Sequence, residues 1–375
     1  MTSRERMNAA MSLSPPDRVP VMAQFSIGHM LLQLGVSPAE FWNDAGVYVD
    51  GLFRMREIYD FDGILVSLHG HDPAWRSNIK ERRQTPGGEE LTWADGSRTL
   101  YPPDDLPRHT PAPNEPVDVR AEEPDDIPAY IPVSQGLRFS IHAAHTFDAI
   151  LETVRRSGGR FSVHGEVTSP FDYLLDRCGH EAALVRLLED PAAVRRDLAL
   201  WSGRVSRLAR RMCATGVDAI KISSPFAGAG FISPGDYRDF ILPAERDVIR
   251  SIREGGAKAY LHTCGAIADR LELMIASGAD GIECLDPPPL GNIELGEAIG
   301  LIGGRCFVKG NVDSVNCLLR GSPDEIRADV RARLEAGRAS PGFILSTACS
   351  IAPGVKREHV MMMSEAVQGT RAGGR

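Results

Sequence analysis

Two side chains that bind soft metal ions stand close together about two thirds of the way along the chain. His262 and Cys264 flank one threonine in Leu261-His-Thr-Cys-Gly265, directly after a short apolar run. A third such side chain, Cys349, follows another short apolar run. Imidazole nitrogen and thiolate sulfur are typical zinc ligands, and catalytic zinc sites combine three protein ligands with one open position. The set therefore indicates a zinc site.

A structural role is the alternative for the two cysteines. Free cysteine is among the most buried residue types and usually packs as a small apolar side chain. The His-x-Cys spacing is also a looser metal signature than two Cys-x-x-Cys pairs. The metal interpretation therefore depends on whether the fold places the three side chains at one position.

The composition bounds the class of protein. The chain has 375 residues, of which 43% are hydrophobic and 25% charged, as in an ordinary globular protein. The net charge of −8 argues against a nucleic-acid partner. No apolar run approaches the roughly 18 residues of a membrane span, and the polar opening has no signal-peptide pattern. We expect a cytoplasmic protein whose seven cysteines stay reduced.

Short apolar runs alternate with helical patterns along most of the chain, which predicts parallel βαβ units. About eight strands favour a single α/β barrel of the (β/α)8 TIM type, and no Gly-x-Gly-x-x-Gly supports a dinucleotide fold. The expected strands are 18–25, 63–67, 160–166, 217–222, 257–261, 281–283, 306–309 and 343–345. The expected helices are 2–11, 38–59, 145–157, 170–188, 194–208, 234–253, 267–277, 295–301, 323–336 and 357–367.

Residues 76–128 differ in character from the rest. Thr85-Pro-Gly-Gly88 and Asp95-Gly96 are turn signals that predict a small antiparallel excursion. The stretch from 102 to 128 is rich in proline and acidic residues, which is typical of a loop or arm. We therefore interpret 1–375 as one barrel domain with an inserted hairpin and loop arm at 76–128.

The chemically capable residues fall at one kind of position. In a parallel barrel the C-terminal ends of the strands share one rim, which is the face that carries active sites. The convergence of the candidates on this rim favours the metal site over cysteines that merely pack. The residues at or just beyond a strand end are Glu166, Ser223, His262, Cys264, Glu283, Asn311 and Cys349.

Three carboxylates are catalytic candidates. Glu166 and Glu283 each end a strand, so either could be a fourth, exchangeable zinc ligand, and either could equally form a rim salt bridge or cap a helix. Asp286 could orient His262 through a hydrogen bond to the imidazole.

Three further residues are candidates for binding a cofactor. Ser223 opens the small-residue loop 223–231, which could let a large flat ligand approach the backbone or could be a flexible connector. Asn311 ends a strand, where turn chemistry is the simpler explanation. His69 follows the second strand and could line the pocket, although a surface histidine is the more common case.

Several segments together resemble the uroporphyrinogen decarboxylase superfamily. The likeness runs nearly end to end, is weakest over 70–130, and implies a distorted (β/α)8 barrel. The segments are residues 2–10 and 16–21, Gly165-Glu-Val-Thr-Ser-Pro-Phe171, Leu261-His-Thr-Cys-Gly265, Gly278-Ala-Asp-Gly-Ile-Glu283, Lys309-Gly-Asn-Val-Asp313 and Ser346-Thr-Ala-Cys349.

The superfamily has two branches that differ in their chemistry. Porphyrinogen decarboxylases work without metal, with arginines after the first strand and an aspartate after the second. Here residues 23–29 contain no arginine and 67–69 no aspartate. The zinc-dependent corrinoid methyltransferases carry His-x-Cys and a distant cysteine, which this chain matches with His262, Cys264 and Cys349. The resemblance to this branch implies that these three bind zinc, with Glu166 or Glu283 as the exchangeable ligand.

The implied activity is a methyl transfer between a corrinoid, such as methylcobalamin, and a small molecule. Zn²⁺ deprotonates a bound thiol and so makes it a nucleophile near neutral pH. A metal-free decarboxylase is the alternative activity, and a barrel that binds a corrinoid or porphyrin without turnover is the alternative class. We expect a small-molecule substrate, a corrinoid-carrying partner protein that docks near the 76–128 arm, and a possible homodimer.

Overall fold

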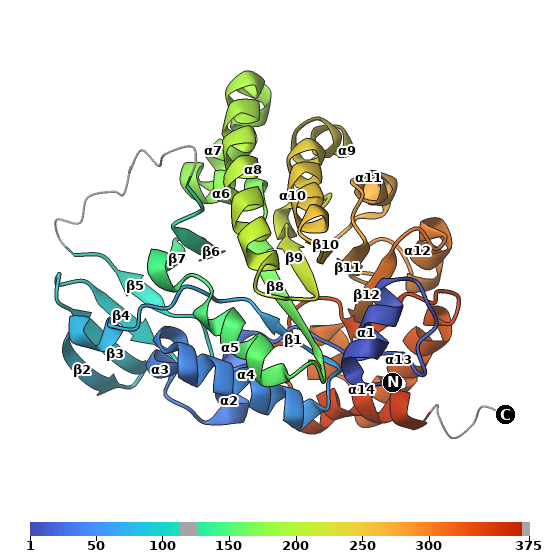
Figure 1. Cartoon of the computed structure of the whole chain (residues 1–375), viewed down its shortest axis with the longest axis horizontal. Helices are drawn as coiled ribbons and strands as arrows, with labels where there is room; N and C mark the ends of the chain where they lie inside the picture. Colours follow the sequence, from blue (N-terminus) through green and yellow to red (C-terminus); the bar gives the residue numbers. More distant parts are fainter. Residues whose placement is uncertain (113–125, 370–375) are drawn as a thin grey trace.

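A curled parallel sheet forms the centre of the computed structural model, which describes residues 1–112 and 126–369 (Figure 1). Its strand order is β1-β8-β9-β10-β11-β12-β13, and all neighbours run parallel. This sheet confirms the expected TIM-type α/β fold. The strands are β1 (Gly63–Val66), β8 (Ser162–Thr168), β9 (Ala219–Ser223), β10 (Lys258–Thr263), β11 (Gly281–Cys284), β12 (Phe307–Val312) and β13 (Phe343–Thr347).

The expected first strand is reduced to two isolated bridges. Val21 pairs with Leu345 and Phe25 with Ile351, on the side of β13. On the other side, the backbone N–H of Asp62 donates to Val21 O at 2.8 Å. Proline has no N–H to donate to a ladder, so Pro20 weakens regular pairing in this segment. Residues 19–25 nevertheless lie between β13 and β1 and close the barrel.

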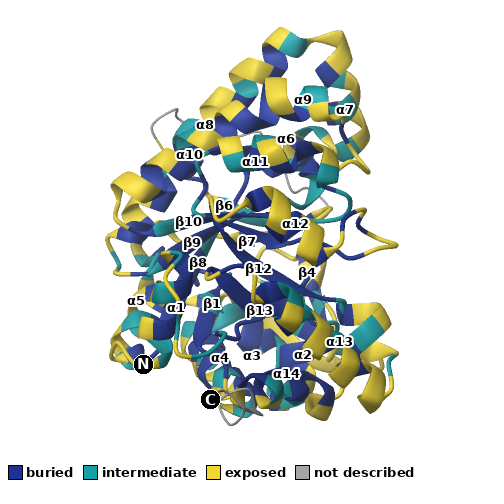
Figure 2. Ribbon diagram, turned by 90° about the vertical axis from the view of Figure 1, so that its right-hand side faces the viewer, coloured by how far each residue is buried: buried dark blue, intermediate teal, exposed yellow. Residues whose placement is uncertain are grey.

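Helices surround the sheet and present exposed faces to solvent, while the strands at the centre are buried (Figure 2). Helix α8 carries the predicted apolar stripe at residues 194, 198, 201, 205 and 208, and all five are buried. The helices are α1 (Ser3–Met11), α2 (Ile27–Leu34), α3 (Pro38–Asn43), α4 (Ala45–Tyr59), α5 (Asp148–Ser157), α6 (Pro170–Cys178), α7 (His180–Glu189), α8 (Pro191–Cys213), α9 (Pro234–Asp236), α10 (Leu242–Glu254), α11 (Leu271–Ala276), α12 (Leu295–Ile302), α13 (Pro323–Gly337) and α14 (Arg357–Gly369).

Two features of the N-terminal part differ from the expectation. The helix expected over 38–59 is divided at Asp44, whose extended backbone ends α3 and whose side chain accepts hydrogen bonds from Gly46 N and Val47 N to cap α4. An aspartate at this position stabilises a helix start. Helix α2 was not expected, and it begins at the N-cap Ser26, whose side chain accepts from His29 N.

Between β1 and α5 the chain leaves the barrel and forms two antiparallel sheets (Figure 1). The turns expected at 85–88 and 95–96 join β2 to β3 and β3 to β4. The antiparallel strands continue to Ser140, beyond the expected end at 128, and residues 113–125 of the expected arm lie outside the described residues. The strands are β2 (Ile79–Thr85), β3 (Gly88–Trp93), β4 (Arg98–Tyr101), β5 (Arg108–Thr110), β6 (Tyr130–Ser134) and β7 (Leu137–Ser140).

The search for membrane spans gives a negative result. Within 1–112 and 126–369, each helix is too short or too polar to cross a bilayer.

Candidate metal centre

Strand register brings four polar side chains into one layer of the barrel. Ser223 of β9 pairs with His262 of β10, His262 with Glu283 of β11, and Glu283 with Lys309 of β12. Residues that pair across parallel strands point to the same face, so the four side chains lie on one face of the sheet. Lys309 is completely buried, and His262 and Glu283 are nearly so. The strand register therefore positions these four side chains next to one another.

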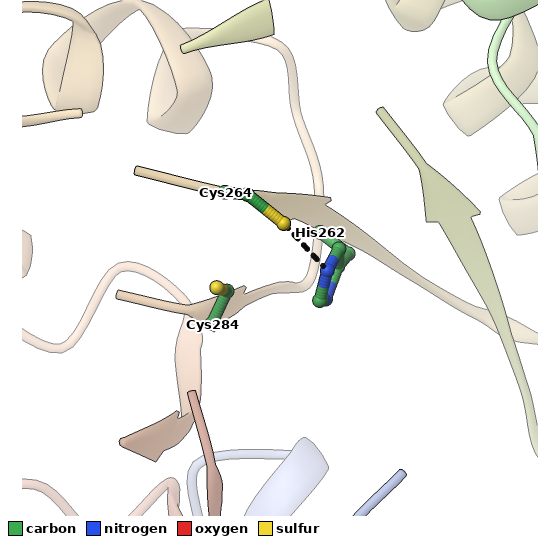
Figure 3. A group of neighbouring side chains, drawn as sticks. All are labelled: His262, Cys264 and Cys284. Atoms are coloured by element: carbon green, nitrogen blue, oxygen red, sulfur yellow. Dashed lines mark hydrogen bonds between the residues drawn. The ribbon is translucent and has the colours of Figure 1, made fainter. Parts of the chain in front are cut away.

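Donor atoms for a metal converge at the ends of β10 and β11 (Figure 3). Cys264 Sγ lies 3.4 Å from His262 Nε2 and 3.9 Å from Cys349 Sγ. The donor atoms of His262, Cys264 and Cys284 all lie within 4.8 Å of one another. The structure thus brings the three predicted ligands together and adds Cys284 to them.

These distances suit a tetrahedral zinc ion. Zinc bonds of about 2.3 Å to sulfur and about 2.0–2.1 Å to nitrogen place neighbouring ligand atoms about 3.5–3.8 Å apart. The separations from Cys264 Sγ to His262 Nε2 and to Cys349 Sγ are 3.4 and 3.9 Å. Thiolate and imidazole donors also select zinc over harder cations. The residues present therefore fit the metal.

Cys284 is the donor that the sequence analysis missed. It ends β11 with φ +85°, and Leu285 follows at φ +52°. Two consecutive non-glycine residues in the left-handed region are strained, and such strain concentrates at functional sites. Its thiol donates to Asp286 Oδ2 at 3.3 Å, and burial raises the pKa of Cys284 to about 12. The turn after β11 holds this sulfur beside Cys264.

Glu283 orients the imidazole of His262. Glu283 Oε2 lies 2.9 Å from His262 Nδ1, and its other oxygen binds Lys309 Nζ. Burial would raise the pKa of Glu283, but Lys309 and His262 hold it well below its usual range. A carboxylate on Nδ1 fixes the proton there and leaves Nε2 free to bind a metal. Asp286, expected in this role, instead accepts from Gly265 N at 2.6 Å.

The pKa values of the predicted ligands reflect their proximity. Burial alone would lower the pKa of His262, but Cys264, Cys349 and Glu283 raise it well above its ordinary value. Cys264 and burial raise the pKa of Cys349, against an opposing effect of His262. The three groups interact because Cys264 Sγ lies close to both His262 Nε2 and Cys349 Sγ.

A second Glu–Lys pair lies one strand pair away. Glu166 of β8 pairs in register with Lys221 of β9, and Glu166 Oε1 lies 3.0 Å from Lys221 Nζ. Lys221 is 0% exposed and also donates to Gln24 Oε1 at 2.5 Å. Burial would lower the pKa of Lys221, but Glu166 and Glu283 raise it. Glu166 Oε2 is buried without a hydrogen-bond partner.

A cavity of about 550 Å³ opens at the barrel mouth beside this pair. The residues after β8 and β9, the segment 24–28 and the β6–β7 hairpin line it, so the antiparallel excursion forms part of its wall. Ser350, which follows Cys349, also lines it. Burial raises the pKa of Asp172, on the cavity wall, to about 7. The cavity therefore adjoins the donor cluster through the chain at 349–350.

The three candidates for cofactor binding lie in different surroundings. Ser223 lines the cavity. Asn311 is buried and donates to Leu285 O at 2.7 Å, so it supports the strained turn after β11. His69 is fully buried against the ring of Phe147, and burial lowers its pKa to about 4. Only Ser223 of the three borders the cavity as the structure describes it.

Sequence reasoning missed Lys221 and Lys309 as well as Cys284. Both lysines stand inside short apolar strands, in Ala-Ile-Lys-Ile and Phe-Val-Lys. Lysine is almost never fully buried unless it is paired, so a lysine in such a strand is itself a signal of a buried carboxylate partner. No comparable signal marks Cys284, because its position depends on a turn with positive φ.

Comparisons with known proteins identify the family of this chain. The family model described as "Uroporphyrinogen decarboxylase (URO-D)" matches residues 93–370. Methylcobamide:CoM methyltransferase MtaA of Methanosarcina barkeri is 29% identical over 40% of this chain and 42% of its own. A uroporphyrinogen decarboxylase of Salinispora tropica is 31% identical over 42% of each chain. The alignments thus span less than half the length of these two relatives.

A solved structure titled "methyltransferase from Methanosarcina mazei" resembles the whole fold, with a TM-score of 0.74 over 99% of both chains and 20% identity. At this identity the likeness concerns the fold alone. The family model covers well over half of the sequence, and enzymes of two kinds, methyltransferases and decarboxylases, are among the relatives. This chain belongs to the uroporphyrinogen decarboxylase (URO-D) family.

Proposed function

We propose that this protein is a zinc-dependent methyltransferase that moves a methyl group between a corrinoid and a small molecule. The observation that carries the proposal is the donor cluster, in which Cys264 Sγ lies 3.4 Å from His262 Nε2 and 3.9 Å from Cys349 Sγ. The likeness to methylcobamide-dependent enzymes supports a corrinoid as the partner in the transfer.

His262, Cys264 and Cys349 are the residues that would hold zinc, with Cys284 as a fourth donor that would give way to the substrate, because a catalytic zinc needs an open position. Bound zinc supplies a Lewis acid that converts a thiol or similar group into a nucleophile near neutral pH. Cys284 is preferred over the two predicted carboxylates because Glu283 is bonded to His262 and Lys309, and Glu166 to Lys221. In this proposal Glu283 positions His262, and Glu166 belongs to the wall of the cavity.

The surrounding residues have separate tasks. Glu283 holds the imidazole so that Nε2 faces Cys264, and Lys309 keeps Glu283 ionised. The cavity beside Glu166 and Ser223 holds the small molecule. A corrinoid, free or carried by a partner protein, approaches from the open mouth of the barrel. A homodimer is compatible with this arrangement, because the site is built from one chain.

The first experiment is elemental analysis of protein purified under reducing conditions without added metal. We expect about one zinc per chain in the wild type. Cys264→Ala and Cys349→Ala should lose it, and Cys284→Ala should bind it more weakly. Transfer from methylcobalamin to a panel of thiols, followed by the cobalamin spectrum, then tests the reaction.

Two other cysteines supply matched controls. Cys306 is buried like Cys284, and Cys317 is partly exposed like Cys264 and Cys349. Cys306→Ala and Cys317→Ala should keep the metal. A wild-type protein that takes up no zinc after reconstitution would contradict the proposal and favour the metal-free decarboxylase. One firmly bound zinc without methyl transfer to any acceptor would favour a binding protein.

A further inference from the structure

Acidic side chains predominate among the titratable residues that line the cavity at the barrel mouth. Its volume of about 550 Å³ is within the range of small-molecule sites. Within the part of the chain that the structure describes, no lysine or arginine lines it. The titratable side chains that line it are Asp105, Glu166, Asp172, Asp176 and His180.

Cations that lie outside the lining already pair with carboxylates of the wall, as Arg108 does with Asp105. Arg138 Nε donates to Asp176 Oδ2 at 2.8 Å, and Lys221 Nζ lies 3.0 Å from Glu166 Oε1. None of these cations belongs to the lining. An anionic ligand would therefore lose its water, find no cation in the described wall and face several carboxyl groups. Burying a charge without a partner is costly, so the described wall disfavours anions.

The same wall offers two features to a cation. Glu166 Oε2 is buried and has no hydrogen-bond partner, although a buried carboxylate oxygen is nearly always bonded. Phe25 and Phe226 line the cavity, and aromatic rings attract cations. Leu68, Ile131 and Val133 add apolar surface for the body of the ligand.

We propose that the small molecule bound in this cavity is an organic cation with an apolar body, a protonated or quaternary amine. This inference rests on the proposed function, since it names the class of the small-molecule partner in the methyl transfer. Glu166, whose side chain is 13% exposed and belongs to the cavity wall, binds the ammonium group, and the apolar wall holds the body. Carboxylates and sulfonates are poor ligands of the same cavity.

A matched series of ligands tests the charge preference directly. The probes are 4-methoxybenzylamine, 4-methoxybenzyl alcohol and 4-methoxybenzoate, which share one ring and differ in charge. Calorimetric titration of the full chain should show the amine binding at least tenfold more tightly than the benzoate, with the alcohol between them. Equal or tighter binding of the benzoate overturns the proposal, and so does the absence of binding by all three.

A designed cation in the wall provides a second test. Ser134 lines the cavity at the exposed end of β6. Ser134→Lys should tighten binding of the benzoate and weaken binding of the amine, whereas the uncharged Ser134→Gln should leave the order of the probes unchanged. The same order of the probes in Ser134→Lys as in the wild type contradicts the proposal.

The two proposals fail in different measurements. The titrations are repeated with Cys264→Ala, which should lack zinc and keep the cation preference, because the cavity wall is unaltered. Loss of the preference with zinc and methyl transfer intact overturns only the ligand class. A wild-type protein that prefers the amine but never binds zinc overturns only the metal-dependent reaction.

Discussion

Two glutamate–lysine pairs on the same sheet differ in how many carboxylate oxygens have a hydrogen-bond partner. Glu283 and Lys309 pair across β11 and β12, and Glu166 and Lys221 pair across β8 and β9, each in direct register. In the first pair both carboxylate oxygens are used, by Lys309 and by His262. In the second, one oxygen binds Lys221 and the other has no partner and belongs to a residue of the cavity wall.

The difference shows that one charge motif can serve two purposes. Beside the metal donors the pair is closed, because Glu283 binds Lys309 with one carboxylate oxygen and fixes the imidazole of His262 with the other. Beside the cavity, the pair is open, because Lys221 holds one oxygen of Glu166 and the other oxygen is buried without a hydrogen-bond partner. Under the proposed function, the partner of the second oxygen distinguishes a carboxylate that orients a metal ligand from one that belongs to the cavity wall.

Removing each lysine should give the largest contrast. Lys309→Met leaves Glu283, with only 2% of its side chain exposed, as a buried charge whose remaining bonded partner is the imidazole of His262. We expect it to lower the free energy of unfolding by about 3–5 kcal/mol. Lys221→Met should cost about 1–3 kcal/mol, because Glu166 borders the cavity and is 13% exposed. Urea denaturation of the metal-free proteins measures both losses, and equal losses would contradict the comparison.

Asp172, a buried carboxyl group on the cavity wall, should make the free energy of unfolding fall as pH rises, which is the opposite of the effect of an ion-paired carboxylate. Burial raises the pKa of Asp172 from 3.8 to about 7. Between these values the unfolded chain ionises and the folded chain does not, so stability falls as pH rises. The loss is on the order of 4 kcal/mol. Asp172→Asn should flatten the dependence of the unfolding free energy on pH in this window.

The flattening should be partial. Burial also raises the pKa of Glu245 to about 7, so Glu245 retains its share of the slope in the Asp172→Asn protein. Unfolding measured from about pH 4 to about pH 8 in both proteins gives the difference curve. A difference that grows as pH falls below about 4 would show that the sign is wrong.

Neutralising each glutamate separates metal binding from ligand binding. Glu283→Gln should weaken zinc binding by about 10–100-fold, because a carboxylate on the far nitrogen orients a metal-binding histidine. Glu166→Gln should leave zinc affinity within a few-fold and weaken binding of the amine probe. Competition with a chromophoric chelator measures the first, and calorimetry the second. Parallel effects of the two substitutions would remove the distinction between the closed and open pairs.

An exposed pair in the antiparallel excursion should show the smallest effect. Arg83 of β2 pairs in register with Glu90 of β3, and Arg83 Nε donates to Glu90 Oε1 at 2.7 Å. Arg83 is 53% exposed, and surface ion pairs contribute only about 0–1 kcal/mol. Arg83→Gln should change the unfolding free energy by less than about 1 kcal/mol in the same urea experiment. A larger change would show that burial does not set the order of the three pairs.

Much of the site's position was predictable because strand ends can be read from apolar runs. His262, Glu283 and Ser223 were placed at the rim, and the register puts all three in one layer. The partners of the glutamates were not predictable in the same way. Whether Glu283 binds metal or imidazole depends on Lys309 one strand further along, and the sequence analysis passed over that lysine.

Backbone conformation explains the remaining differences. Cys284 reaches the donor cluster from a turn with positive φ, and nothing in Glu283-Cys284-Leu285 announces such a turn. The first strand was expected as a regular member of the barrel, but Pro20 limits its ladder to isolated bridges. Periodicity thus predicted the order of the elements, whereas local exceptions to regular geometry determined the fine placement.

The closure of the barrel by residues 19–25 has a consequence for exchange of backbone amide hydrogens. Beside β1, this segment is held to Asp62 by one backbone hydrogen bond, from Asp62 N to Val21 O, and by the bond from Val21 N to Asp62 Oδ2. Local opening should cost less here than between regularly paired strands, so amide protons should exchange with solvent sooner. Gln24 and Phe25 of the same segment line the cavity. A ligand in the cavity would therefore slow deuterium uptake at this edge of the barrel, which makes the segment a label-free reporter of occupancy.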